Sequence, residues 1–233
     1  DLLLIDAAAE VDGYSADITR TFPANGKFSA PQRALYELVL AAETEGVAMA
    51  APGATMRGIH DQAVRTLTEG MVDLGLLPMS VDESLAMHHY KHFYFHGTGH
   101  WLGMDVHDRG VHRVDGRPRP LEQGMAFTVE PGIYVGPEKA TIELTLLEYD
   151  SDEWIERRIL EGRASALAKE KAAIDAAEKV THEVPDEFLG IGIRIEDDVV
   201  ITEDGCENMT TGVPVSIDEV EAMCAEGSAL PRA

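Results

Sequence analysis

Cysteine and basic residues are scarce in this chain of 233 residues, and each shortage excludes a class of protein. Two cysteines, Cys206 and Cys224, are too few for a disulfide framework, so we expect a reducing compartment and a cytoplasmic location. No apolar run approaches the roughly 18 residues that a membrane-spanning helix needs. The pattern of a signal peptide, a basic stretch followed by an apolar one, is also lacking. The chain opens on Asp1 without an initiator Met, so an upstream targeting signal could be missing from it.

The shortage of basic residues leaves a strongly acidic chain. Lys and Arg number 19 against 42 Asp and Glu, which gives a formal net charge of -23 at pH 7. Such a charge repels phosphate backbones, so nucleic acid and anionic membranes are not expected as partners. Two interpretations of the acidic residues remain: a solvated, highly soluble surface, or carboxylates that converge on cations. Composition does not choose between them, but the positions of the carboxylates can.

Short apolar stretches predict strands in separate groups along the chain. Residues 2–5 are a continuous apolar run that ends at Asp6, which is typical of a buried strand whose last residue emerges at a site. Residues 11–22 predict a strand, a turn and a second strand. Residues 124–130 predict a strand that ends at a carboxylate and turns at Pro-Gly, and residues 191–201 alternate as a further strand does.

Two helices are predicted between the first strands and the later ones. The first begins after Ser29, an N-cap residue before Pro31, and ends near residue 51. The second covers residues 56–74, with Thr55 as its N-cap and a glycine at its end. Strands grouped around a helical block indicate an α+β domain rather than regular βαβ alternation.

One segment departs from this compact plan. Residues 141–150 alternate as a strand might, and residues from about Ile155 to Val180 are rich in Ala, Glu and Lys, with Gly162 the only helix breaker. This composition predicts a helix that is exposed on one face. Two roles remain open for the excursion: a peripheral decoration, or an element that binds a partner or gates the substrate.

Five side chains with metal-binding chemistry stand at predicted strand ends, beside a glycine or a turn. They are Asp6, Asp17, His100, Glu130 and Glu196. Four carboxylates and one imidazole form a hard, oxygen-rich ligand set that suits Mn²⁺, or less selectively Co²⁺ or Zn²⁺, and disfavours a cysteine-based structural zinc site. Five ligands are too many for one open catalytic ion, but they fit two divalent ions bridged by carboxylates, about 3.5–4 Å apart.

Four sequence blocks around these residues resemble those of aminopeptidase P and proline dipeptidase, the proline-specific metallopeptidases. The signature block is His-Gly-Thr-Gly-His-Trp-Leu-Gly-Met-Asp-Val-His-Asp, at residues 96–108. The others follow the family's order and are Ile5–Ala7 with Ser15–Phe22, Thr128–Tyr134, and Gly192–Asp198. Apart from the excursion, the match extends from the first residues to about Thr210.

The resemblance implies the pita-bread fold, two αβ halves related by a pseudo-two-fold axis, with the metal site between them. Asp6 and Asp17 would bind one metal, and Asp17 and Glu196 would bridge to the second. His100 and Glu130 would complete the second metal's ligands. A water or hydroxide between the two ions would be the nucleophile.

The resemblance also implies catalytic roles. Glu130 matches the ligand that serves as general base for the water. His96 and His107 match histidines that contact the substrate and stabilise the tetrahedral intermediate. Arg194, on the same predicted strand face as Glu196, matches an arginine that orders the site, although a purely structural ion pair is an equal alternative. The group at His88, His89 and His92 has no counterpart in the resemblance and is not predicted to bind metal.

Two departures from the family are expected to matter. Only five residues precede Asp6, so a separate N-terminal domain and an upstream substrate-contacting histidine have no counterpart. The chain is therefore interpreted as an N-terminally truncated catalytic domain, residues 1–233, that is either a fragment or completed by a partner chain. The second departure is a helical insertion at about residues 137–187, where shorter family members pass almost directly to the next strand.

The resulting prediction is an Xaa-Pro aminopeptidase that hydrolyses the N-terminal Xaa-Pro bond of peptides. Trp101 and the Arg20–Pro23 segment both favour this branch of the family. The expected partner is a peptide with proline at its second position, and a homo-oligomer is a further possibility. A proline dipeptidase is the alternative enzyme, a non-catalytic pita-bread binding module is the alternative from another class, and carbon–nitrogen hydrolases of the same fold are more remote.

Overall fold

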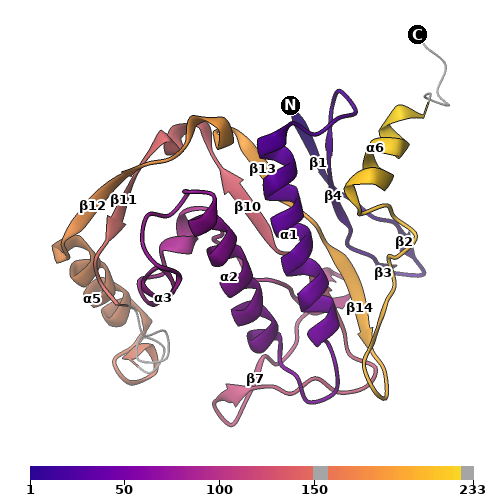
Figure 1. The fold of residues 1–233 in the computed structure, drawn as a ribbon. Helices are drawn as coiled ribbons and strands as arrows, with labels where there is room; N and C mark the ends of the chain where they lie inside the picture. Colours follow the sequence, from indigo (N-terminus) through magenta and orange to yellow (C-terminus); the bar gives the residue numbers. More distant parts are fainter. Residues whose placement is uncertain (149–156, 227–233) are drawn as a thin grey trace.

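The computed structural model describes residues 1–148 and 157–226 (Figure 1). Helices and strands are mixed along the chain, which confirms the predicted α+β class. The helices are α1 (Ala30–Met49), α2 (Met56–Asp73), α3 (Val81–Ala86), α5 (Arg163–Ala176) and α6 (Ile217–Ala225). Short 3-10 turns are η1 (His89–His92), η2 (Pro137–Ala140) and η3 (Asp186–Phe188). In the described part of the chain, no helix combines the length and apolar character needed to cross a bilayer.

The longer strands pair antiparallel in separate small sheets. Their pairs are β1 (Leu2–Asp6) with β4 (Thr19–Pro23), β10 (Gly132–Val135) with β13 (Ile191–Arg194), and β11 (Thr141–Thr145) with β12 (Lys179–Glu183). A three-stranded sheet is formed by β15 (Cys206–Asn208), β14 (Asp197–Ile201) and β9 (Ala126–Val129). Two-residue strands form hairpins: β2 (Glu10–Val11) with β3 (Tyr14–Ser15), β5 (Leu102–Gly103) with β6 (Val106–His107), and β7 (Arg113–Val114) with β8 (Arg117–Pro118).

The first two helices begin where their caps predict. The side chain of Gln32 accepts a hydrogen bond from the Ser29 backbone N–H at 2.9 Å, and α1 follows directly. Thr55 Oγ1 accepts one from the Gly58 N–H at 3.0 Å and starts α2. The two helices lie side by side in Figure 1 and cover one face of β10 and β13.

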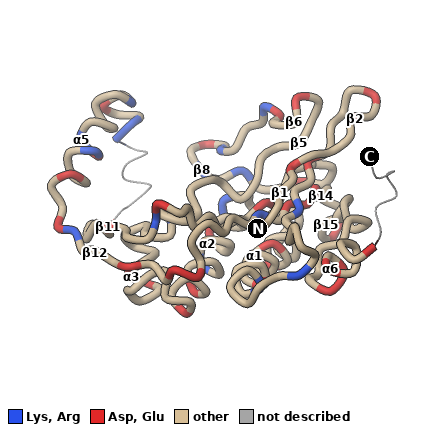
Figure 2. The backbone as a smooth tube through the Cα atoms, turned by 90° about the horizontal axis from the view of Figure 1, so that it is seen from above, with Lys and Arg blue, Asp and Glu red and all other residues tan. Residues whose placement is uncertain are grey.

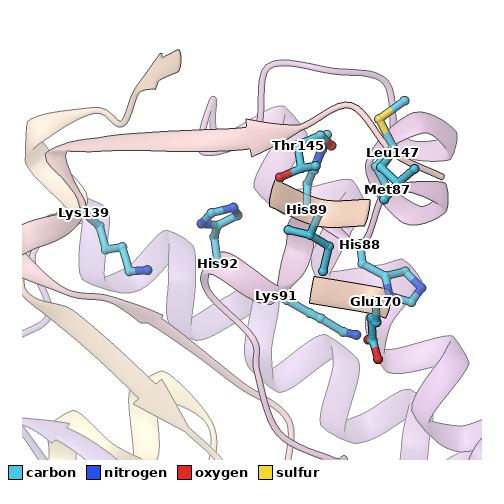
Figure 3. Close-up of a pocket in the computed structure, with 10 residues that line it drawn as sticks. Met87, His88, His89, Lys91, His92, Lys139, Thr145, Leu147 and Glu170 are labelled. Atoms are coloured by element: carbon cyan, nitrogen blue, oxygen red, sulfur yellow. Dashed lines mark hydrogen bonds between the residues drawn. The ribbon is translucent and has the colours of Figure 1, made fainter. Parts of the chain in front are cut away.

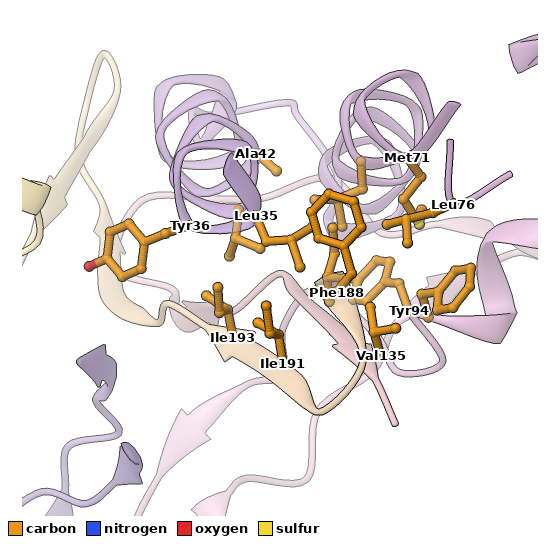
Figure 4. Packing of buried hydrophobic residues seen from close by; sticks show 14 of the residues in the cluster. Leu35, Tyr36, Ala42, Met71, Leu76, Tyr94, Val135, Phe188, Ile191 and Ile193 are labelled. Atoms are coloured by element: carbon orange, nitrogen blue, oxygen red, sulfur yellow. The ribbon is translucent and has the colours of Figure 1, made fainter. Parts of the chain in front are cut away.

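The larger hydrophobic core lies between this helix pair and the β10–β13 strands (Figure 4). Leu35 of α1, Met71 of α2 and Ile193 of β13 are all fully buried in it. A smaller core surrounds β9, where Phe127 and Val129 pack against Trp101. The helices thus hold the strands that carry the predicted site residues at their ends.

Two strand predictions need correction. The run at residues 2–5 is a strand but not a buried one, because Leu3 is 48% and Ile5 is 43% exposed. Within the described ranges, β1 pairs with β4 alone, so its other edge and part of each face remain open. Residues 191–201 form two strands rather than one, since β13 ends at Arg194 and β14 begins at Asp197, with Glu196 in the break.

The excursion is a hairpin that carries a helix rather than one long helix. β11 covers the first half of the predicted 141–150 strand, and residues 149–156 lie outside the described ranges. α5 begins after Gly162 and ends at Ala176, and the last residues of the predicted helix belong to β12 instead. Val180 of β12 pairs with Leu144 of β11, whose side chain is fully buried, so packing overrides the helical propensity there.

Burial predicts which leucines stabilise this fold. Leu35→Ala should lower the free energy of unfolding by about 2–5 kcal/mol, because Leu35 is fully buried in the larger core. Leu160→Ala is the control, since that side chain is 76% exposed and its loss should change stability by less than about 0.5 kcal/mol. Urea denaturation followed by circular dichroism measures both. Equal losses for the two variants would contradict this location of the core.

Candidate metal centre

Three strand pairs meet at the predicted site. The break between β13 and β14 places Glu196 beside the start of β4, where the Glu196 N–H donates to the Thr19 carbonyl at 3.1 Å. Thr19 in turn pairs with Asp6 at the end of β1. Asp197, next to Glu196, pairs with Val129 of β9, and Glu130 follows Val129 directly. Strands far apart in the sequence therefore lie beside one another, and the carboxylates at their ends come close together.

Asp17 occupies the loop between β3 and β4 and is 8% exposed. Its backbone N–H donates to Asp198 Oδ2 at 3.0 Å, which fixes the loop against β14. Burial first, and the neighbouring Asp6 second, raise the pKa of the Asp17 carboxyl above its ordinary value. Asp6 itself is partly exposed at the end of β1.

His100 has a nitrogen that is free for a ligand bond. Its Nδ1 lies 3.0 Å from the Trp101 carbonyl oxygen, and the hydrogen bond places a proton on Nδ1. Its Nε2 is buried, has no hydrogen-bond partner in the described part of the chain, and lies 3.2 Å from Asp17 Oδ2 and 3.7 Å from Glu130 Oε1. A histidine nitrogen that lies between two carboxylates, with its other ring nitrogen fixed by a backbone carbonyl, is a donor arrangement that suits a metal ion.

Glu196 and Glu130 add the remaining carboxylates. Glu196 is 1% exposed, and its Oε2 accepts a hydrogen bond from Thr19 Oγ1 at 2.6 Å. Burial, together with the charge of Glu130, raises the pKa of Glu196 to about 8. Burial likewise raises the pKa of Glu130. Several buried carboxylates at one point are costly without a compensating cation, so the ligand set fits a bound metal.

The structure brings all five predicted ligands together in overlapping groups. Each group offers three donor atoms that lie within 4.8 Å of one another. The groups are Asp6–Asp17–Glu196, His100–Glu130–Glu196 and Asp17–His100–His107. Asp17, Glu196 and His100 each belong to two groups, so the arrangement offers more than one ion position. His107 was predicted as a substrate contact, and its ring lies 4.1 Å from that of His100.

Arg194 and His96 meet at Tyr134, a residue that was not predicted to belong to the site. Arg194 Nη1 donates to the Tyr134 hydroxyl at 3.2 Å, and His96 Nε2 lies 2.9 Å from the same oxygen. Arg194 Nη2 donates to Asp6 Oδ2, while its Nε is 3.9 Å from Glu196. Arg194 therefore orders Asp6 more directly than Glu196. Tyr134 lies in the same sequence block as Glu130. Only the position of Tyr134 on β10 shows that its hydroxyl contacts both Arg194 and His96.

A second arginine, Arg20, fixes the backbone at Glu196 and its neighbour Asp197. Arg20 is 8% exposed, and its Nη1 donates to the Glu196 carbonyl at 2.8 Å. Its Nη2 forms an ion pair of 2.6 Å with the buried Asp197. The sequence did not predict this role for Arg20, because Arg20 and its partner Asp197 are 177 residues apart.

The three histidines at residues 88, 89 and 92 lie away from this centre. They line a cavity of about 410 Å³ between η1 and the excursion, together with Lys91, Lys139 and Glu170 (Figure 3). His89 Nε2 lies 2.9 Å from the Thr145 carbonyl oxygen of β11. Among the residues described, these histidines form no group of donor atoms close enough to hold an ion.

Comparison with known proteins gives one family. The model of metallopeptidase family M24 matches residues 1–203. An Xaa-Pro aminopeptidase of Escherichia coli K12 is 40% identical over 223 residues, which cover 96% of this chain and 41% of that protein. Xaa-Pro aminopeptidase 3 of Homo sapiens is 32% identical over 230 residues, covering 98% of this chain and 36% of that protein.

Solved structures show the same fold. The Pseudomonas aeruginosa aminopeptidase PepP superposes with a TM-score of 0.77 at 45% identity, over 97% of this chain and 41% of that one. Zinc-substituted E. coli aminopeptidase P in complex with product superposes with a TM-score of 0.75 at 39% identity, over 96% of this chain and 41% of that one. The predicted pita-bread fold is thereby confirmed. The chain spans about two fifths of the length of these relatives.

Two glycines beside His100 provide a matched test of the geometry. A Cβ at Gly99 would lie 1.9 Å from the Thr128 carbonyl oxygen, whereas a Cβ at Gly97 would lie 3.8 Å from its nearest neighbour. Gly99→Ala should therefore displace His100 from β9 and lower the free energy of unfolding by about 1–3 kcal/mol. Gly97→Ala should fold with nearly unchanged stability. Chemical denaturation measures both, and a Gly99→Ala variant as stable as Gly97→Ala would contradict the close contact.

Proposed function

The chain belongs to metallopeptidase family M24, and we propose that it carries the catalytic site of an exopeptidase that hydrolyses the Xaa-Pro bond at a peptide N-terminus. The observation that supports this proposal is the cluster of four carboxylates around an unpartnered His100 nitrogen. That donor set has the chemistry of a hydrolytic metal centre rather than of a structural one, because it lacks cysteine and its three donor groups overlap. The reaction class follows from the centre, and the preference for proline follows from the names of the relatives.

The metal content is proposed from the donor atoms. Carboxylate-rich sites suit Mn²⁺, and Co²⁺ or Zn²⁺ are alternatives. Asp6 and Asp17 would hold one ion, His100 and Glu130 the other, and Asp17 and Glu196 would be shared between them. When bound, such ions lower the pKa of water toward about 7 and thereby supply a nucleophile at neutral pH.

Glu130 is the proposed general base. Its carboxylate lies at the end of β9, and its backbone N–H donates to the Thr98 carbonyl at 2.8 Å, which fixes it against the segment that carries His100. The carboxylate is positioned to accept a proton from the attacking water and return it to the leaving nitrogen. A group that is both fixed and partly desolvated loses little free energy to reorganisation during the reaction.

His96, His107 and Arg194 are proposed to act on the substrate side of the centre. His96 and Arg194 both contact the Tyr134 hydroxyl, so the three side chains hold one another in place. His107 is exposed, and its ring packs edge-on against that of His100. Imidazole N–H groups in these positions can donate hydrogen bonds to the oxygen that gains charge when the peptide carbonyl is attacked.

The proposed partner is a peptide with proline at its second position. A proline dipeptidase is the second candidate, since it would use the same centre but also recognise the substrate's C-terminal carboxylate. A non-catalytic module of this fold is less favoured, because all five ligand positions are occupied by metal-binding side chains.

The wider setting is also proposed. We treat residues 1–233 as one catalytic domain, and the β11–α5–β12 excursion as an insertion within about residues 137–187. The two cysteines are free, as in a reducing compartment, which fits the proposed cytoplasmic location. A homo-oligomer is proposed only by analogy with the family.

Hydrolysis of three peptides tests the proposal. With Mn²⁺ present, the chain should release free alanine from Ala-Pro-Phe, and much less from Ala-Ala-Phe, because proline is required at the second position. Release from Ala-Pro but not from Ala-Pro-Phe would identify a dipeptidase instead. Absence of release from all three, in a chain that binds the metal, would overturn catalysis by this chain alone.

Variants separate ligands from substrate contacts. His100→Ala should lose bound metal and activity together, because it removes the single nitrogen donor among the five proposed ligands. His107→Ala should keep its metal while the turnover number falls by about 10²–10³-fold, as for the loss of an oxyanion donor. His112→Ala, an exposed histidine outside the ligand groups, is the control for both. Metal content and initial rates, measured on all three variants, separate ligands from substrate contacts. Loss of metal in His107→Ala would identify His107 as a ligand.

A further inference from the structure

A second pocket lies behind the segment that joins His96 to His100. Its volume is about 250 Å³, and it is formed by the first turn of α2, residues 97–99 and the β7–β8 hairpin. Figure 1 shows β7 close to the end of α2 that begins the helix. None of the five metal-ligand candidates lines this pocket.

The pocket is basic although the chain is strongly acidic. Arg57, Arg113 and Arg119 line it, and among the described residues that line it there is no Asp or Glu. Figure 2 shows Lys and Arg positions beside β8 on a backbone otherwise richer in Asp and Glu. In a chain with a formal net charge of -23, three guanidinium groups at one pocket are a marked local reversal of charge.

Two of these arginines, Arg57 and Arg119, have exposed acidic partners that a bound anion can displace. Arg57 pairs with Asp61 at 2.7 Å and Arg119 pairs with Glu122 at 3.3 Å, and in both pairs the acid lies outside the pocket and is more than half exposed. Exposed pairs of this kind contribute little, so an anion that is bound in the pocket can compete for the guanidinium groups. Arg113 donates its Nε to the Gly116 carbonyl at 3.0 Å, which holds it in the hairpin.

Backbone charge adds to the side-chain charge. α2 is 18 residues long, and its first two residues, Met56 and Arg57, line the pocket. The N-terminal turn of a helix carries a partial positive charge and favours anions. The helix therefore reinforces the three arginines rather than defining a site by itself.

The wall of the pocket is connected to the metal centre by hydrogen bonds. Thr98 is 4% exposed, and its Oγ1 lies 2.8 Å from His60 Nδ1 and 2.5 Å from the Tyr94 hydroxyl. The Thr98 carbonyl accepts the Glu130 N–H at 2.8 Å. His60 also lines the pocket, and burial lowers its pKa to about 4, so it contributes a hydrogen bond rather than a charge at neutral pH.

We propose that this pocket binds a small dianion of the phosphate class, held by Arg57, Arg113 and Arg119, and that the bound anion steadies the segment of residues 97–99 behind the metal centre. Planar guanidinium groups pair with phosphate oxygens through two parallel hydrogen bonds, and several of them favour a dianion over a monoanion. The volume suits such an ion and is too small for a folded partner. The site is independent of the proposed peptidase activity and can be tested without it.

Equilibrium dialysis with radiolabelled inorganic phosphate is the test. The full chain should bind one phosphate saturably, with and without Mn²⁺, because the metal-free sample removes any phosphate held by the ions. The double variant Arg113→Ala/Arg119→Ala should weaken binding at least about tenfold, since each lost charge-assisted bond contributes substantially. Arg117→Ala is the matched control, because Arg117 is on the same hairpin but does not line the pocket.

Hydrogen exchange gives a second measurement on the same samples. Phosphate should slow amide exchange in a peptide that covers residues 97–99, and the double variant should abolish this slowing. The proposal is overturned if phosphate does not bind saturably, or if Arg117→Ala weakens binding as much as the double variant does. Displacement of phosphate by Ala-Pro-Phe would also overturn it, because the pocket would then bind a peptide carboxylate.

Discussion

Mutual repulsion among four carboxylates is the constraint around which this structure is built. Asp6, Asp17, Glu130 and Glu196 approach one another where three strand pairs meet, and burial raises the pKa of the last three. Without contacts that fix their positions, these like-charged side chains would move apart to lower their Coulomb repulsion. Each is instead held from outside the cluster by a backbone or side-chain contact, so the repulsion is retained for a cation to relieve.

The holding contacts come from elements that are remote in sequence. Arg20 of β4 donates a hydrogen bond to the Glu196 carbonyl and forms an ion pair with Asp197. Asp198 accepts a hydrogen bond from the Asp17 backbone N–H. On the opposite side, Thr128 Oγ1 accepts the His100 N–H at 3.2 Å. Most of these partners are polar groups without a charge of their own or ions that are already paired. They orient Asp17, Glu196 and His100 without neutralising the two carboxylates, whereas Asp6 forms an ion pair with Arg194.

Local patterns predicted much of this arrangement, and long-range contacts account for what they missed. N-caps at Ser29 and Thr55 predicted both long helices, because caps act within one turn. The five candidate ligands were predicted from their residue types and sequence blocks, and the structure places them together. The strand at Lys179–Glu183 was missed because its pairing with β11 outweighs a helical composition. Arg20 and Tyr134 were missed as site residues because their contacts depend on which strands become neighbours.

The open edge of β1 has a thermodynamic consequence for the centre. Asp6 closes a strand that pairs with β4 alone among the described elements and leaves Leu3 and Ile5 partly in solvent. Strands of this kind fray at a lower free energy than the body of a domain. One candidate ligand therefore stands on a strand with an unpaired edge, while Glu196 is 1% exposed and stands in a buried break. The affinity of an ion at the proposed Asp6 position would then include the free energy of closing β1, so a contact that covers that edge would strengthen ion binding from a distance.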